Sequence, residues 1–369
     1  MLNGHDSAVN LSISNSSSAW YEPEPVYFLS NEFFDISFDE NYNIKSIYDK
    51  KNCREVIREG ERANVLLAFE DKPHNYDAWN INIYYREKMW EIKNVESAGL
   101  IERGPVRTGL KITRKFLDSI IEQIIYIYNH IPRIDFATRI DWKERQILLK
   151  AAFPVDVHSE KATFDIQYGN VERPTHWNTS WDYARFESVA HKWVDISEDG
   201  YGVSLLNDCK YGHDVKDGVI RITLLKSAVS PNTDADREVH EFTYSLYPHG
   251  GGWREGNTVQ MAYALNCPMY SLIGEPHEGS LPPEFSLLKT DKDNVIPEVI
   301  KKAEDSDDIV IRVYECYNRR TNVSLTFFRD LTEVWECDLM ENNIGKVDFA
   351  GNKFEFTIRP YEIKTFKIK

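Results

Sequence analysis

The chain has 369 residues, of which 42% are hydrophobic and 13% are aromatic. This length is enough to bury a substantial core and predicts two or three domains. The formal net charge is −15, with 59 acidic against 44 scattered basic residues. That balance argues against binding to nucleic acid or to an anionic membrane surface, because both need clustered Lys and Arg.

Cysteine usage and the N-terminus bear on the compartment. The five cysteines lie far apart and form no C-x-x-C pair, which favours free thiols in a reducing compartment. The first twenty residues lack the basic start and apolar core of a secretory signal. No apolar run approaches the ~20 residues of a membrane helix. We therefore expect a soluble, cytoplasmic protein.

In chain order, residues 1–27 hold a Ser/Asn cluster and EPEP, and we expect a disordered or extended lead-in. Short alternating runs follow, which is typical of strands. FFDISFD (33–39) and IKSIYD (44–49) predict a hairpin across the turn ENYN. Further strands are predicted at 120–129, 134–142, 147–155, 200–208, 219–227 and 240–249. Helical periodicity is weak, except for a short stretch near 296–303.

A domain boundary is predicted where GEPHEGSLPPEF brings three prolines and two glycines together. Beyond it, short runs such as IVIRVYECYN and EIKTFKIK recur at intervals of about ten residues, which is typical of a small sandwich. The predicted fold class is mostly β. We expect a large β domain at 28–274, a linker at 275–292 and a small β domain at 293–369.

The motifs of several catalytic classes are missing from the chain. None of the ten histidines begins an H-x-D, H-x-H or H-E-x-x-H motif, and there is no G-x-S-x-G and no phosphate loop. The glycines of YGHDVKDG and YPHGGGWREG are expected in turns. Carboxylates are plentiful, but the sequence does not show which of them face each other.

Five polar stretches rich in aromatic residues join the predicted strands, at 69–90, 173–187, 207–214, 230–242 and 247–256. Aromatic faces combined with Asp, Asn, Arg and His suit carbohydrate. The same composition suits a domain interface, which is also rich in Trp, Tyr and Arg. Of these two interpretations, composition alone favours the interface.

Long phrases of the chain resemble the C-terminal β region of glycoside hydrolase family 38, the alpha-mannosidases of the cytosolic or bacterial type. They are NEFFDISFDENYNIKSIYDKKNCREV (31–56), the stretch 69–90, VERPTHWNTSWDYARFESVAHKWVDISEDGYGVSLLNDCKYG (171–212), HEFTYSLYPH (240–249), KKAEDSDDIVIRVYE (301–315) and RPYEIKTFKIK (359–369). The resemblance implies a large antiparallel β super-sandwich of the galactose-mutarotase-like kind, followed by a small β-sandwich domain.

The resemblance also implies what is missing. Family members begin with an α/β domain that carries a zinc-binding His-x-Asp and an aspartate nucleophile, and these motifs are not in this sequence. We therefore expect a non-catalytic β region without a cofactor of its own, the zinc belonging to the missing catalytic domain. The expected partners are that N-terminal domain and, in the intact enzyme, a mannose-containing oligosaccharide hydrolysed with retention. A second copy of the chain, in a homo-oligomer, is a further possible partner.

In this interpretation the five polar stretches face the catalytic domain and help to shape its substrate cleft. The candidate cleft or interface residues are His176, Trp177, Trp181, Asp182, Tyr183, Arg185, Asp208, Tyr211, Asp236 and Arg237. The alternative function is a stand-alone carbohydrate-binding or mutarotase-like sugar epimerase module. Its acid and base would come from His176, His191 or His240 with a carboxylate.

Overall fold

The computed structural model describes residues 25–276, 278–280 and 282–369. Most of the predicted lead-in at 1–27 and two positions of the predicted linker therefore lie outside the described residues. The fold is mostly β, as predicted, with strands β1 to β28 and only three short helices in the part described. Two compact units are present, one of residues up to 165 with 172–268, the other of 166–171 with 269–369.

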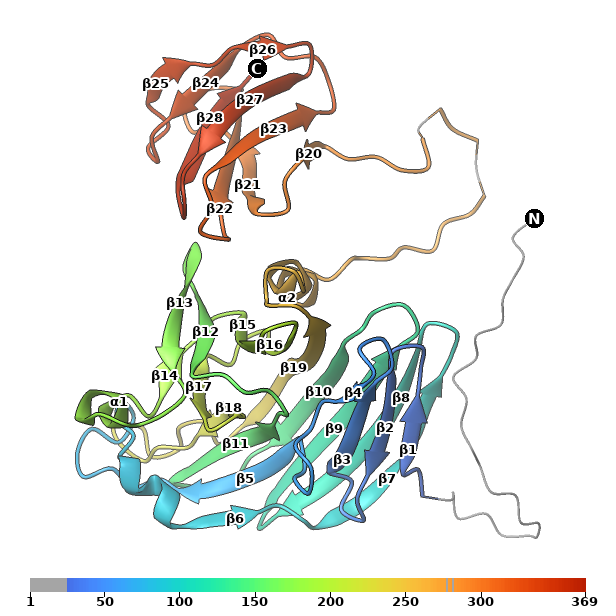
Figure 1. Ribbon diagram of the computed structural model, residues 1–369, viewed down its shortest axis with the longest axis vertical. Helices are drawn as coiled ribbons and strands as arrows, with labels where there is room; N and C mark the ends of the chain where they lie inside the picture. The colour runs from blue at the N-terminus through green and yellow to red at the C-terminus, as the bar shows by residue number, and fades with distance from the viewer. Residues whose placement is uncertain (1–24, 277, 281) are drawn as a thin grey trace. The chain divides into compact units, whose positions relative to one another are not determined.

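The first unit begins with a four-stranded sheet in the order β1-β2-β3-β4 (Figure 1). Its strands are β1 (Phe28–Ser30), β2 (Phe34–Phe38), β3 (Ile44–Asp49) and β4 (Arg54–Glu55). The predicted hairpin is confirmed, because β2 pairs antiparallel with β3. Alternate residues of β2 are buried, as expected for a strand with one face on the core.

A nine-stranded sheet follows, in the order β13-β12-β15-β16-β19-β10-β9-β8-β7. Strand β9 shows a strict alternation of buried and partly exposed residues, so one face of this sheet lies on the core. The strands are β7 (Val95–Arg103), β8 (Arg107–Phe116), β9 (Ser119–Tyr128), β10 (Ile134–Asp141), β12 (Lys161–Ile166), β13 (Gly169–Pro174), β15 (Trp193–Glu198), β16 (Tyr201–Asn207) and β19 (Val239–Gly250).

A six-stranded sheet in the order β14-β17-β18-β11-β5-β6 packs against the nine-stranded one. Phe153 of β11 lies 5.6 Å from Phe136 and 6.1 Å from Tyr244, measured between ring centroids, and these two residues belong to β10 and β19. The core of the first unit therefore lies between the two sheets. The strands are β5 (Val65–Glu70), β6 (Met89–Glu91), β11 (Ile147–Pro154), β14 (Ser188–Val189), β17 (Gly212–Lys216) and β18 (Val219–Lys226).

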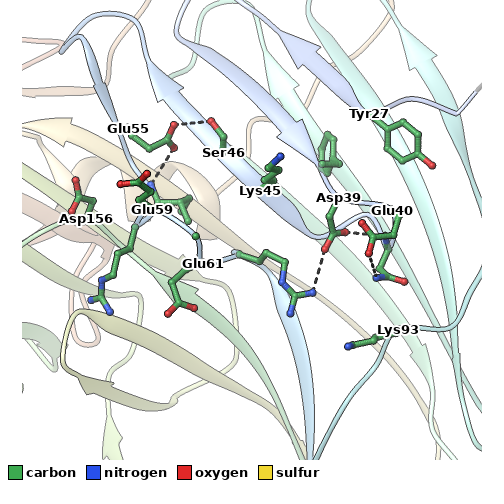
Figure 2. Close-up of a pocket in the computed structure, with 16 residues that line it drawn as sticks. Tyr27, Asp39, Glu40, Lys45, Ser46, Glu55, Glu59, Glu61, Lys93 and Asp156 are labelled. Carbon is green, nitrogen blue, oxygen red and sulfur yellow. Dashed lines mark hydrogen bonds and ion pairs between the residues drawn. The ribbon is translucent and has the colours of Figure 1, made fainter.

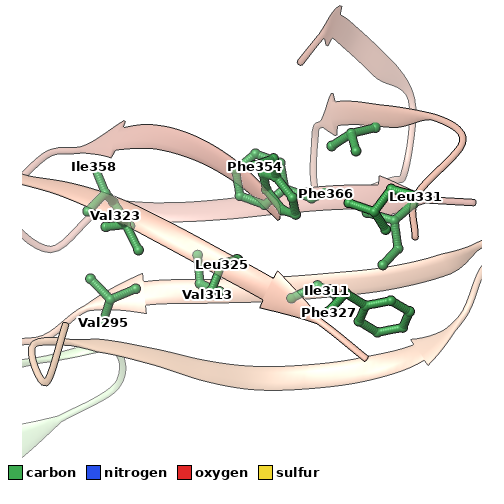
Figure 3. Close-up of a cluster of buried hydrophobic side chains, with 12 residues drawn as sticks. Val295, Ile311, Val313, Val323, Leu325, Phe327, Leu331, Phe354, Ile358 and Phe366 are labelled. Carbon is green, nitrogen blue, oxygen red and sulfur yellow. The ribbon is translucent and has the colours of Figure 1, made fainter. Parts of the chain in front are cut away.

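The second unit is a small sandwich of a four-stranded sheet, β20-β23-β27-β26, and a five-stranded sheet, β21-β22-β28-β24-β25. Buried residues from both sheets, among them Leu325, Phe354 and Phe366, form its core (Figure 3). The strands are β20 (Leu288–Thr290), β21 (Val295–Lys302), β22 (Ile309–Glu315), β23 (Thr321–Phe327), β24 (Val334–Cys337), β25 (Asn343–Lys346), β26 (Phe349–Ala350), β27 (Lys353–Ile358) and β28 (Ile363–Ile368).

Two local predictions were wrong, and one helix was not predicted. The stretch near 296–303 is strand β21 rather than helix, because it pairs antiparallel with β22. A β-bulge between Pro297 and Val299 interrupts the alternation of side chains along this strand, so the apolar residues do not show the period of two that is typical of a strand. The segment YGHDVKDG contains strand β17 rather than only a turn. Helix α2 (Thr258–Asn266) was not expected, because its buried face consists of only three residues.

Two further observations concern the expected compartment. None of the helices in the part of the chain described is long and apolar enough to cross a membrane. All five cysteines are free thiols, and three of them are exposed.

Candidate functional site

Two of the polar stretches, 69–90 and 173–187, lie against each other in the first unit. The Tyr85 hydroxyl donates a hydrogen bond of 2.9 Å to Glu187, and its ring lies 6.3 Å from that of Phe186. The guanidinium of Arg86 stacks 4.0 Å above the Trp177 ring. Two segments that are about a hundred residues apart in sequence thus form one surface.

Each of the two segments carries a short helix with its own cap. In the first, η1 (Ile83–Glu87) begins after Asn82, whose side chain accepts a hydrogen bond from the Tyr84 amide. In the second, α1 (Ser180–Ala184) begins with a capping box in which Thr179 and Asp182 each accept a hydrogen bond from the other's amide. The predicted site residue Asp182 is therefore occupied in holding α1.

A group of buried charges, here called the Lys150 cluster, lies beneath these two segments. Its members are Lys150, Glu187, Asp214, Arg221 and Arg86. The Lys150 side chain is fully buried and contacts Glu187 as well as Asp214, the latter at 2.7 Å. Arg221 lies 2.7 Å and Arg86 3.7 Å from Asp214. The cluster therefore connects β11, β17 and β18 to both polar segments.

The pKa values of the cluster follow from burial and charge together. Burial acts to raise the pKa of the Asp214 carboxyl, but Lys150 and Arg221 outweigh it and hold that pKa below its ordinary value. Burial raises the pKa of the Glu187 carboxyl, and the attraction of Lys150 alone does not outweigh it. Burial acts to lower the pKa of Lys150, but Asp214 and Glu187 outweigh it. Because the charges compensate one another, we interpret the cluster as a structural junction.

The stretches 207–214 and 230–242 join the same surface. Asp214 itself belongs to the first of them. The second, together with the preceding Val229, is joined to the stretch 69–90 by two hydrogen bonds, from the Val229 amide to Asp77 at 2.7 Å and from the Ala78 amide to the Ser230 carbonyl at 3.1 Å. Four of the five predicted polar stretches are thus in contact, whereas 247–256 contacts other parts of the first unit.

Large aromatic side chains stand exposed on the two adjoining segments. Trp79 is 74% exposed and Trp181 is 75% exposed. Because contiguous exposed apolar patches on soluble monomers often mark binding surfaces, these side chains are candidates for a contact surface. We call this set the aromatic surface; its members are Tyr76, Trp79, Tyr84, Trp90, Trp181 and Tyr183.

The structure places the remaining sequence candidates as follows. Trp177 is half-buried under Arg86, and His176 lies 3.8 Å from Asp182. Arg185, Tyr211 and Asp236 are exposed.

Two of the candidates have structural partners. The Asp208 carboxylate accepts a hydrogen bond from the Thr243 amide. Arg237 donates to the Lys143 carbonyl at 2.8 Å and pairs with Asp234. A role at a substrate cleft stays a prediction for all ten.

Sequence reasoning missed Lys150 and Tyr85, on which the surface depends. Lys150 interrupts the apolar run ILLKAAFPV of a strand that is buried along its whole length. A charged residue in such a run is a usable signal, because a buried Lys requires a partner. The partner itself is not visible in the sequence.

The histidines of the alternative function lie on different segments. His191 packs against Tyr211, and the His240 ring bonds the Asp236 carbonyl. Together with Glu238, Asp236 and His240 form the one group of three potential metal ligands within 4.8 Å among the described residues. Two of the three are exposed, and such groups are common as solvated side chains. The described residues therefore do not fit a catalytic zinc site, and we derive no reaction step through a metal.

A wide groove of about 1330 Å³ lies elsewhere in the first unit, along the turn at 39–41 and the segment 57–62 (Figure 2). Some of its charged groups have partners. Arg62 lies 3.2 Å from Asp39 and 2.6 Å from Glu91, and Glu55 accepts a hydrogen bond from Ser46. Asp39 and Glu55 are therefore engaged in structural contacts, and the groove gives no positive indication of an acid–base pair.

Comparison with known proteins gives the family. The description "Glycosyl hydrolases family 38 C-terminal domain" matches residues 29–234, and "Glycosyl hydrolases family 38 C-terminal beta sandwich domain" matches residues 294–366. Alpha-mannosidase G of Dictyostelium discoideum is 36% identical over 358 residues, which cover 92% of this chain and 32% of that protein. Alpha-mannosidase 2C1 of Homo sapiens is 34% identical over 346 residues, covering 91% and 33%.

A solved structure supports the fold. The crystal structure of an alpha-mannosidase from Enterococcus faecalis has a TM-score of 0.75 at 18% identity, covering 97% of this chain and 44% of that one. The chain spans about a third of the length of the curated relatives that it matches. The chain belongs to glycoside hydrolase family 38, of which it carries the C-terminal domain and the C-terminal beta sandwich domain.

Proposed function

We propose that this chain is the non-catalytic C-terminal β region of a cytoplasmic alpha-mannosidase. In the intact enzyme, a catalytic domain would hydrolyse alpha-linked mannose with retention, using a zinc ion held by its own residues. This region would pack against that domain and help to shape its substrate cleft. The observation that carries the proposal is the family match along nearly the whole chain to relatives about three times as long.

The aromatic surface supports this proposal, and we propose it as the docking site of the catalytic domain. Its exposed rings lie on two segments that the Lys150 cluster holds in place beneath them. Interfaces take most of their binding energy from a few such Trp and Tyr residues. Anchors that are already held in position lose little conformational freedom on binding, which favours association.

Activity of the chain alone is the first test. The purified chain is incubated with an aryl alpha-mannoside, with and without added zinc. We expect no turnover above the blank, because the described residues do not fit a catalytic zinc site. Measurable hydrolysis by the chain alone would contradict the proposal.

Docking is the second test. A tagged Dictyostelium alpha-mannosidase G lacking its matching C-terminal third is co-expressed with this chain and purified through the tag. We expect the chain to co-purify, and the double variant Trp79→Ala/Trp181→Ala to lose at least about tenfold in affinity. The matched control is Leu117→Ala, which removes another exposed apolar side chain. If the double variant and the control bind equally well, the aromatic surface is not the docking site.

A further inference from the structure

The polar stretch 247–256, which is not joined to the aromatic surface, lines a pocket of its own. This pocket has a volume of about 220 Å³ and lies between the turn at 49–52 and the segment 247–257. Phe33, Phe34 and Pro132 contribute apolar lining. The volume corresponds to about seven water molecules in the liquid, so the pocket is suited to one small molecule and not to an extended chain.

A buried histidine lines this pocket. His249 is 5% exposed, and its Nε2 lies 2.8 Å from Asp195 and 3.2 Å from the Ser204 hydroxyl. The other ring nitrogen, Nδ1, has no hydrogen-bond partner among the described residues. A buried polar atom without a partner costs stability and calls for an explanation.

The chain makes room for this imidazole with two glycines. A Cβ at Gly256 would lie 2.5 Å from His249 Nδ1, and a Cβ at Gly202 would lie 2.5 Å from its Cε1. Any other residue at either position would displace the ring or the backbone. Gly256 and His249 both line the pocket.

The remaining polar groups of the lining suit hydroxyl groups. The Asp49 carboxylate is held by the Asn52 amide and by the Tyr201 hydroxyl at 3.1 Å. Glu255 uses one oxygen to accept from the Gly252 amide, and the Asn257 side chain makes no capping bond. These oriented carboxylate and amide groups can accept from and donate to neighbouring hydroxyls.

Charge narrows the choice of ligand. The lining carries two carboxylates, Asp49 and Glu255, against the single cation Lys51. An anionic ligand would be disfavoured by this balance. A neutral ligand with several hydroxyls and an apolar C–H face matches the polar groups and the Phe33 ring together.

We propose that this pocket binds a single neutral monosaccharide or a polyol of the same size. The inference goes beyond the proposed function, because it assigns a ligand site to this chain alone and does not depend on docking of a catalytic domain. Asn52, Glu255 and Asn257 would bind the hydroxyls, and Phe33 would contact the C–H face.

The test is a ligand-observed NMR titration of the full chain with D-mannose, with gluconate as an anionic molecule of similar size. We expect saturable binding of D-mannose and at least about tenfold weaker binding of gluconate. Glu255→Gln and Asn257→Ala should each weaken D-mannose binding by about tenfold. Both side chains are exposed, so these variants should fold, which their thermal midpoints check. Leu117→Ala is the control for an unrelated surface change.

Three outcomes would overturn the proposal. One is the lack of saturable binding up to about 100 mM D-mannose. Another is binding that neither pocket variant weakens. The last is binding that survives in both pocket variants but is lost in Trp181→Ala, which would place the sugar on the aromatic surface. The proposed docking function would be unaffected by any of them, because its test measures co-purification.

Discussion

Replacement of Lys150 by Met tests whether the buried charges hold the two polar segments in place. Lys150→Met keeps the length and much of the volume of the side chain, but it removes the cation that, among the described residues, contacts both Glu187 and Asp214. Asp214 retains Arg221 at 2.7 Å. In the part of the chain that the structure describes, Glu187 retains the hydrogen bond from the Tyr85 hydroxyl, so its buried charge loses its main compensation.

The expected loss of stability is large. Removing one partner of a buried ion pair costs about 3–5 kcal/mol, because the remaining charge stays buried. A loss of about 4 kcal/mol changes the unfolding constant about a thousandfold, and in a unit of this size it lowers the melting temperature by about 10 °C. The matched control is Lys161→Met, since Lys161 pairs with Glu172 at 2.9 Å with both side chains largely exposed. Exposed pairs contribute about 0–1 kcal/mol.

Urea unfolding followed by tryptophan fluorescence would measure both variants. The double variant Lys150→Met/Glu187→Gln removes the uncompensated carboxylate as well, and we expect it to recover part of the loss. The reasoning would be refuted if Lys150→Met cost no more than Lys161→Met. It would also be refuted if the double variant were the sum of two independent losses.

Three further predictions concern other parts of the chain. Burial lowers the pKa of His213 to about 4, so its contribution to stability is fully present above the unfolded value near 6.5 and is lost as the pH falls toward 4. The free energy of unfolding that is lost amounts to about 3 kcal/mol. Urea unfolding at several pH values should show that the free energy of unfolding of His213→Gln falls less steeply below pH 6.5 than that of the unchanged protein, and equal slopes would contradict the prediction. Phe354→Ala should cost the second unit about 3–5 kcal/mol, and hydrogen exchange should then accelerate in β23, β27 and β28 while the core of the first unit stays protected. Thr179→Ala breaks the capping box of α1, costs about 1 kcal/mol and should speed exchange of the Asp182 amide about fivefold, whereas an unchanged rate would count against the cap.

Much of the fold could be predicted from short-range patterns. Alternation of apolar and polar residues in FDISF and IKSIYD predicts two strands, and the turn residues between them predict their pairing. The same alternation marks β9, because one face of a sheet must be buried and the other is partly solvated. Helix α2 was missed because only three of its nine residues are buried, and so few apolar positions do not give a recognisable helical periodicity.

Long-range contacts decided the candidate site. Composition selected the stretches 69–90 and 173–187 as polar and aromatic, but not whether they meet. The Arg86–Trp177 stacking and the Tyr85–Glu187 hydrogen bond join residues about a hundred positions apart. Such contacts depend on where the strands between them are placed in the sheets, and no local pattern encodes that.

The sequence by itself determined many of the strands, the mostly β class of fold and the five polar stretches, because each depends on neighbours within a few residues. Only the tertiary structure decided which of those stretches share a surface. It also decided which charges are compensated, as at Lys150, and which polar atoms are left without a partner, as at His249. The physical reason is that burial and electrostatic compensation depend on every group packed around an atom, and in this β fold those groups come from distant parts of the chain.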